Sequence, residues 1–103
     1  MAPETVLEEA NRIIYGDREK TYGHPAKNFE ATAALWNGYL QSKNGEDAFL
    51  HILPFTAVDV AHLMILLKMA RELHMHKRDN VVDMCGYAGC IQKMEDYKDE
   101  VPF

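Results

Sequence analysis

The sequence is poor in the residues that mark several common classes of small protein. Only two cysteines, six glycines and four prolines occur among 103 residues. Two cysteines are too few for a disulfide-stapled secreted domain, and the chain has no low-complexity stretch or internal repeat. Its longest apolar stretch, residues 63–67, is far too short to cross a membrane. We therefore expect one ordinary globular domain over residues 1–103, with a core of its own.

Basic residues are also few: the chain has 11 Lys and Arg against 16 Asp and Glu, and its net charge is −5. A nonspecific nucleic-acid binder needs a basic face, so this class is excluded. Residues 1–5 have neither the basic start nor the apolar run of a signal peptide. On a helix Cys85 and Cys90 would point roughly 140° apart, too far to share a metal or form a bridge easily, and we expect both to be buried small hydrophobic residues in a reducing cytoplasm.

Apolar periodicity predicts two helices in the first half of the chain. The first follows Thr5, which forms a capping box with Glu8, and it stops at Gly16. A polar loop over residues 17–24 is expected next. Pro25 suits the first turn of the second helix, which ends in the turn at residues 42–45.

Two more helices are predicted in the second half. Residues 46–54 could form a short helical turn or an extended connection, and the sequence leaves both open. The third helix follows a capping box of Thr56 and Asp59. Its apolar residues extend nearly all the way round, so one neighbouring layer cannot cover it. We therefore predict an all-α, four-helix bundle-like domain that is oligomeric through this buried third helix.

The fourth helix is expected to begin near Asn80. Gly86 and Gly89 stand inside it, where each glycine costs about 1 kcal/mol relative to alanine. A close approach of another backbone would explain both glycines.

The loop between the first two helices carries the densest set of functional side chains: Arg18, Lys20, Tyr22 and His24, with Asn28 just beyond. These groups could hold a phosphate and stack on a base. The plain alternative is a structured turn in which the tyrosines pack and the charges stay solvated.

Two cations in the third helix form a second candidate. Lys68 and Arg71 are three residues apart, so their side chains can converge on an anion. Alternatively, they lie along the helix end with Lys68 paired to Glu72, where cations are favoured without any ligand.

The start of the fourth helix is a third candidate. Asp79 and Asp83 could present carboxylates to Mg²⁺. Asn80 could instead be the N-cap with Asp83 at the third position. In a third interpretation, Asp83 orients Lys68 or Arg71.

Five segments taken together resemble a known family. They are Tyr15–Arg18, Tyr22–Pro25, Asn28–Phe29, Leu67–Arg71 and Arg78–Asp83. In this order they resemble a family of small, mostly phage-encoded proteins of uncharacterised function. The chain is also distantly similar to nucleotide-modification-associated domains of phages and to MazG-type nucleotide pyrophosphohydrolases. The resemblance implies an oligomeric helical protein that handles nucleotides in the cytoplasm of an infected host cell.

The chain departs from the MazG metal motif. In that motif a Glu-Glu pair is followed by a third Glu, whereas Arg12 stands there after Glu8 and Glu9. The third helix carries Lys68 and Arg71 where the resemblance calls for carboxylates. Cations neutralise phosphate directly and do not activate water, so the departure favours binding over hydrolysis.

The sequence thus predicts a protein that binds and sequesters a phosphorylated nucleotide, or a nucleotide-derived signal of host defence, without catalysis and without a cofactor. Its expected partners are a nucleotide or cyclic nucleotide and further copies of itself, with no membrane. One alternative is a Mg²⁺-dependent pyrophosphohydrolase built on Glu8, Glu9, Asp79 and Asp83; another is a module that binds a host protein. The predicted ligand-binding residues are Arg18, Lys20, Tyr22, His24, Asn28, Lys68, Arg71, Arg78, Asp79, Asn80 and Asp83.

Overall fold

The computed structural model describes residues 2–100, and the side chains of residues 2–97. The described chain is helical and contains no strand, which confirms the all-α prediction. The four predicted helices are all present, as α1 (Val6–Tyr15), α3 (Pro25–Asn44), α4 (Ala57–His74) and α5 (Arg78–Glu100). None of the described helices is long and apolar enough to span a membrane.

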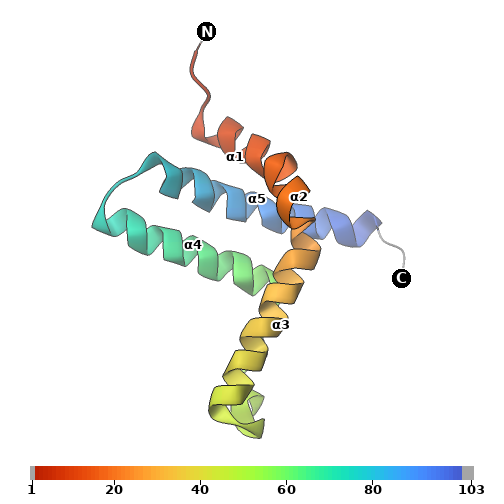
Figure 1. Ribbon diagram of the computed structural model, residues 1–103. Helices are drawn as coiled ribbons and strands as arrows, with labels where there is room; N and C mark the ends of the chain where they lie inside the picture. Colours follow the sequence, from red (N-terminus) through yellow and green to blue (C-terminus); the bar gives the residue numbers. More distant parts are fainter. Residues whose placement is uncertain (1, 101–103) are drawn as a thin grey trace.

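The helices form an open arrangement around α5 (Figure 1). Helix α4 runs antiparallel along one side of α5, and α1 packs along α5 as well. Helix α3 starts beside α5, crosses at a steep angle and projects away from the other helices. The molecule measures 57 × 42 × 21 Å, so it is only about two helices thick.

Both predicted capping boxes are present. The Thr5 hydroxyl accepts a hydrogen bond from the Glu8 N–H at 3.1 Å, and the Glu8 carboxylate accepts one from the Thr5 N–H at 3.1 Å. Thr56 and Asp59 make the same reciprocal pair at 3.2 and 2.8 Å. Each box satisfies two N–H groups that a helix start leaves without partners, which explains why α1 and α4 begin where the sequence predicts.

Residues 17–22 correct the expectation of a loop, because Asp17–Tyr22 forms a short helix, α2. The segment lies between Gly16 and Gly23. It begins with Asp17, a residue favoured at a helix N-terminus, and good helix formers follow it. Gly23 ends it with φ of 80°, a conformation that favours glycine. The segment that the sequence left open begins with a 3₁₀ turn, η1 (Glu46–Phe49), and then becomes irregular.

The start of the last helix also differs from the prediction. Helix α5 begins at Arg78, so Asn80 lies inside its first turn and does not cap it. The buried Asn80 side chain instead donates to the Glu72 carboxylate at 3.2 Å. Glu72 also accepts from the Lys77 N–H at 2.9 Å and contacts His76. These hydrogen bonds lower the pKa of Glu72, and the one with His76 has the largest effect. They also fix the turn between α4 and α5.

The core lies where α1 and α4 meet α5, around Ile14, Ala61, Cys90 and Met94. The glycines of α5 serve this contact. A Cβ atom at Gly89 would come within 2.6 Å of the Ile14 Cδ1 atom, so a side chain approaches closely here and the predicted backbone approach is wrong. Both cysteines are free thiols; Cys90 is buried as the sequence predicts, whereas Cys85 is only partly buried.

Candidate ligand-binding site

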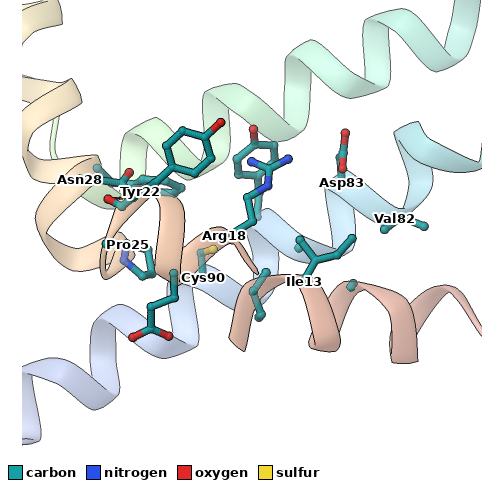
Figure 2. Close-up of a pocket in the computed structure, with 15 residues that line it drawn as sticks. Ile13, Arg18, Tyr22, Pro25, Asn28, Val82, Asp83 and Cys90 are labelled. Atoms are coloured by element: carbon teal, nitrogen blue, oxygen red, sulfur yellow. Dashed lines mark hydrogen bonds between the residues drawn. The ribbon is translucent and has the colours of Figure 1, made fainter. Parts of the chain in front are cut away.

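A pocket of about 190 Å³ opens where α1, α2, α3 and α5 meet (Figure 2). A dry apolar cavity of about 150 Å³ can hold benzene, so this pocket is large enough for one planar ring. Apolar side chains supply most of its wall, and a few polar groups stand among them. The polar and aromatic lining residues are Arg18, Glu19, Tyr22, Asn28, Phe29, Asp83 and Tyr87.

Helix α2 carries the outer wall of the pocket. Arg18 and Tyr22 are four residues apart and therefore share one face of this helix. The guanidinium carbon of Arg18 lies 5.9 Å from the centroid of the Tyr22 ring, at the outer limit of a cation–π contact. Both side chains are exposed and point the same way in Figure 2, with Asp83 beyond the guanidinium. A cation and an aromatic face thus stand together at the rim.

Helix α3 closes one end of the pocket. Its N-terminal turn places Asn28 and Phe29 in the wall. The Asn28 amide donates to the Tyr22 carbonyl at 3.4 Å, a long hydrogen bond that ties the end of α2 to α3. The ring of Phe29 lies 6.1 Å from that of Tyr87, in a tilted pair. The aromatic pair supplies apolar ring surface at this end of the pocket.

Helix α5 forms the floor, which includes Asp83, Gly86 and Cys90. The Asp83 carboxylate lies 2.7 Å from the Lys68 ammonium of α4, and both side chains are mostly buried. Of the three interpretations of Asp83, this contact matches the one in which it pairs with Lys68. Burial raises the pKa of the Cys90 thiol, so the cysteine is a poor nucleophile.

The pocket therefore unites four of the predicted ligand-binding residues and touches a fifth. Arg18, Tyr22, Asn28 and Asp83 line it, and Lys68 reaches it through Asp83.

Three of the predicted residues instead make structural contacts elsewhere. His24 caps α3, because its Nδ1 atom accepts from the Ala26 N–H at 3.1 Å, and its ring lies 4.7 Å from that of Tyr97. Arg78 donates to the Glu4 carbonyl at 2.9 Å. Asn80 holds the α4–α5 turn, as described above.

The remaining three predicted ligand-binding residues, Lys20, Arg71 and Asp79, are exposed. Lys20 and Asp79 line neither this pocket nor a second, shallow hollow near the α4–α5 turn. Arg71 lies beside this second hollow, together with His74 and Lys77. In the single copy Lys68 is paired with Asp83 while Arg71 lies beside this hollow, so the clamp of these two cations stays a prediction.

Lys93 is a buried cation that the sequence analysis missed. Only 4% of it is exposed. Its ammonium donates to the Ile14 carbonyl at 2.8 Å and to the Glu19 carboxylate at 2.6 Å, and it lies 4.4 Å from the Tyr15 ring centroid. The hydrogen bond from Lys93 lowers the pKa of Glu19. Lys93 thus anchors α2, the outer wall of the pocket, to α5. Its spacing of three from the buried Cys90 puts the two residues on one side of the helix, and this was the signal in the sequence that Lys93 could be buried.

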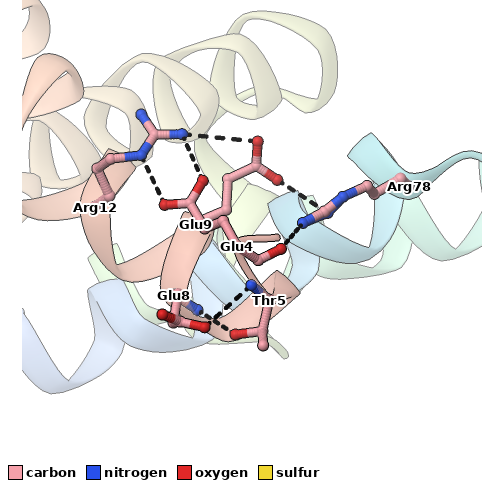
Figure 3. Close-up of polar contacts among 6 residues, drawn as sticks. All are labelled: Glu4, Thr5, Glu8, Glu9, Arg12 and Arg78. Atoms are coloured by element: carbon pink, nitrogen blue, oxygen red, sulfur yellow. Dashed lines mark hydrogen bonds and ion pairs between the residues drawn. The ribbon is translucent and has the colours of Figure 1, made fainter. Parts of the chain in front are cut away.

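Three of the four carboxylates of the alternative metal site, those of Glu8, Glu9 and Asp83, are used elsewhere. Glu8 belongs to the capping box of α1. Arg12 and Arg78 reach Glu4 and Glu9 from opposite sides (Figure 3), with Arg78 3.2 Å from the Glu9 carboxylate.

Arg12 binds the Glu4 carboxylate through two nitrogens, at 2.9 and 3.1 Å, and this bond lowers the pKa of Glu4. Within the described part of the chain, no three His, Cys, Asp or Glu side chains are grouped to hold a metal ion.

The fold and the pocket define a small all-α protein with one ring-sized, largely apolar pocket that has a cation at its rim. The chain belongs to a family described as a domain of unknown function (DUF6378), which matches residues 5–95. It is 44% identical over 92 residues to the Gene 55 protein of Mycobacterium phage D29 and 41% identical over 97 residues to the Gene 55 protein of Mycobacterium phage L5.

These alignments cover 88% and 93% of the chain but only 54% and 56% of the relatives, so the chain spans about half their length. No solved structure matches it. The expected resemblance to phage proteins is confirmed, whereas the more distant similarity to MazG-type enzymes stays a prediction.

Proposed function

We propose that the chain binds a phosphorylated nucleotide without hydrolysing it, with the base in the pocket and the phosphate at its rim. The observation that carries this proposal is the pairing of a ring-sized cavity with a guanidinium at its mouth. The cavity of about 190 Å³ fits one planar ring, and its mostly apolar wall is unfavourable for a charged phosphate. The charged part of the ligand would therefore stay outside, where Arg18 stands.

The lining residues suit a base in particular. Tyr22, Phe29 and Tyr87 offer aromatic surface for stacking. Asn28 can both donate and accept a hydrogen bond, and Asp83 accepts, so together they can read the edge of a base. Lys68 would act as a positioning residue, since its ion pair fixes the Asp83 carboxylate.

The contacts of the carboxylates support binding without cleavage. Hydrolysis of a phosphoanhydride through Mg²⁺ needs several carboxylates that converge on the metal ion. Glu8 and Glu9 instead serve a helix cap and two arginines, and Asp83 is paired with Lys68. The relatives come from phages, and a phage protein that holds a nucleotide intact would withdraw a nucleotide signal from host defence.

A thermal-shift screen with mono-, di-, tri- and cyclic nucleotides, with and without Mg²⁺, tests the proposal. A ligand that binds the native state raises the melting temperature by mass action. We expect a shift that does not need Mg²⁺, with the nucleotide recovered intact by chromatography. Release of pyrophosphate in the presence of Mg²⁺ would contradict it and favour the hydrolase.

A further inference from the structure

The side of α4 that faces away from α5 is apolar and uncovered. Leu63, Leu66, Ala70 and Leu73 lie along it, and all four are exposed. Their exposed fractions rise to 56% at Leu66 and 83% at Leu73. The opposite side of the helix packs into the molecule, where Ala61 is fully buried.

The spacing of these residues is that of a helix–helix seam. Successive positions are separated by three, four and three residues, the a/d pattern of a coiled coil. We name this set, Leu63, Leu66, Ala70 and Leu73, the α4 seam. It contains no charged residue, and the nearby Lys68 is turned inward to Asp83.

The chain exposes more surface than a compact monomer of its size. Its accessible surface is 7571 Å², whereas a folded monomer of 11.8 kDa exposes about 5,900 Å². The excess of about 1,700 Å² is about twice the area of about 800 Å² that each partner buries in a standard interface. None of the described large side chains is fully buried. A single copy therefore leaves a core unfinished.

The symmetry of the seam identifies a second copy as the occupant. The spacing reads the same in both directions, so an antiparallel copy of α4 sets Leu63 against Leu73 and Leu66 against Ala70. Each contact then pairs a leucine with an equal or a smaller side chain, which allows the two helices to interlock. A two-fold axis generates this self-complementary contact from one surface.

We propose that the protein is a homodimer in which the α4 seams of two copies pack antiparallel about a two-fold axis. The proposal is independent of the proposed ligand, because none of the seam residues lines the pocket.

Light scattering after size-exclusion chromatography tests the dimer. The wild-type chain is expected at twice its mass of 11.8 kDa. Leu66→Glu and Leu73→Glu should each shift it to the monomer mass, because a charge in an apolar seam loses its water without gaining a partner. Leu7→Glu is the matched control, since Leu7 is 71% exposed on α1, and it should leave the dimer intact.

Leu73→Glu keeps the test decisive, because a side chain that is 83% exposed in the single copy cannot disturb its fold; circular dichroism should confirm its helicity. A wild-type monomer at the highest concentration reached would overturn the proposal and assign the seam to another partner. A dimer that survives both seam variants would overturn it as well.

A charge-swap variant tests the antiparallel register. In Leu63→Glu/Leu73→Lys, the antiparallel arrangement sets each glutamate against the lysine of the other copy. We expect this double variant to recover the dimer that Leu73→Glu loses. A parallel arrangement would oppose like charges at both positions, so failure to dimerise would overturn the antiparallel register.

Discussion

The two sides of the molecule differ in the side chains that they carry and in how far these side chains have partners within one copy. Where α1 and α2 meet α5, ion pairs join separate elements: Arg78 binds Glu9, and Lys93 binds Glu19. On the outer side of α4 the side chains are apolar and exposed. The first side carries the pocket, and the second carries the α4 seam.

This contrast separates two roles within one small chain. The ion-paired side is joined within a single copy, because Glu9 and Glu19 are paired with residues of α5 and α2 is anchored. The apolar side leaves its leucines exposed in a single copy, and the proposed second copy would stabilise it by covering them. Variants on the first side should change the stability of each subunit, whereas variants on the seam should change the assembly.

The largest effect on the ion-paired side is expected from Lys93→Met. The change leaves the Ile14 carbonyl without its donor and frees α2 from α5. An unsatisfied buried group costs about 1–3 kcal/mol, so the free energy of unfolding in urea should fall by about that amount. Lys27→Met, at an exposed lysine, is the control and should change it by less than about 0.5 kcal/mol. Equal effects of the two variants would refute the anchoring role of Lys93.

A smaller loss of stability is expected from Asn37→Ala, which breaks a link between α3 and the segment that leads into α4. The Asn37 side chain donates to the Phe55 carbonyl at 3.0 Å and accepts from the Phe55 N–H at 2.8 Å. Each such bond contributes about 0.5–1.5 kcal/mol, so urea unfolding should show a loss of about 1–2 kcal/mol. Asn44→Ala removes only an exposed bond to Leu40 of the same helix and should be nearly neutral. A neutral Asn37→Ala would mean that this link does not hold α3 to the start of α4.

The glycines of α5 allow a finer comparison. A Cβ atom at Gly86 would lie 3.4 Å from the Ile14 side chain, an ordinary contact, whereas at Gly89 it would lie 2.6 Å away. Gly86→Ala should therefore raise the free energy of unfolding by up to about 1 kcal/mol through helix propensity. In Gly89→Ala the displaced Ile14 side chain should offset that gain. Thermal unfolding measures both, and a larger gain at Gly89 would contradict the packing described here.

The smallest effect is a pH dependence that comes from Glu19. Its hydrogen bond from Lys93 lowers the pKa of Glu19 below 4.5 in the folded chain. The stabilisation is therefore fully present above the unfolded pKa and is lost as the pH falls through the folded value. Melting temperatures between about pH 6 and about pH 3 should fall less steeply in Glu19→Gln than in the wild type. Identical slopes would show that Glu19 is not coupled to Lys93.

The helices could be predicted because their signals are local. Thr5 and Thr56 cap the helices that follow them, each through a residue three positions on. Helix α2 was missed because a polar six-residue segment has no apolar face to reveal it. The last helix was placed two residues late because Asn80 is a good capping residue, yet its partner is Glu72 of the preceding helix.

The site was harder to predict, because its partners lie far apart in the sequence. Arg18 and Tyr22 belong to one short segment, so their proximity could be predicted. The Lys68–Asp83 ion pair joins two helices and appeared only as one of three interpretations. The only local signal for Lys93 is its spacing of three from Cys90, and its partner Glu19 lies 74 positions away.

The central claim is that a nucleotide lies in the pocket with its phosphate at Arg18. Calorimetric titration of the best nucleotide from the screen into the wild type, Arg18→Gln and Arg71→Gln tests it most directly. Hydrogen bonds to charged groups contribute about 1.5–3 kcal/mol, so Arg18→Gln should raise the Kd by about 10- to 100-fold. Arg71→Gln, at an exposed arginine outside the pocket, should leave the Kd unchanged. The opposite result, a loss of nucleotide affinity in Arg71→Gln alone, would contradict the proposed pocket. It would place the ligand at the end of α4 near Arg71 instead.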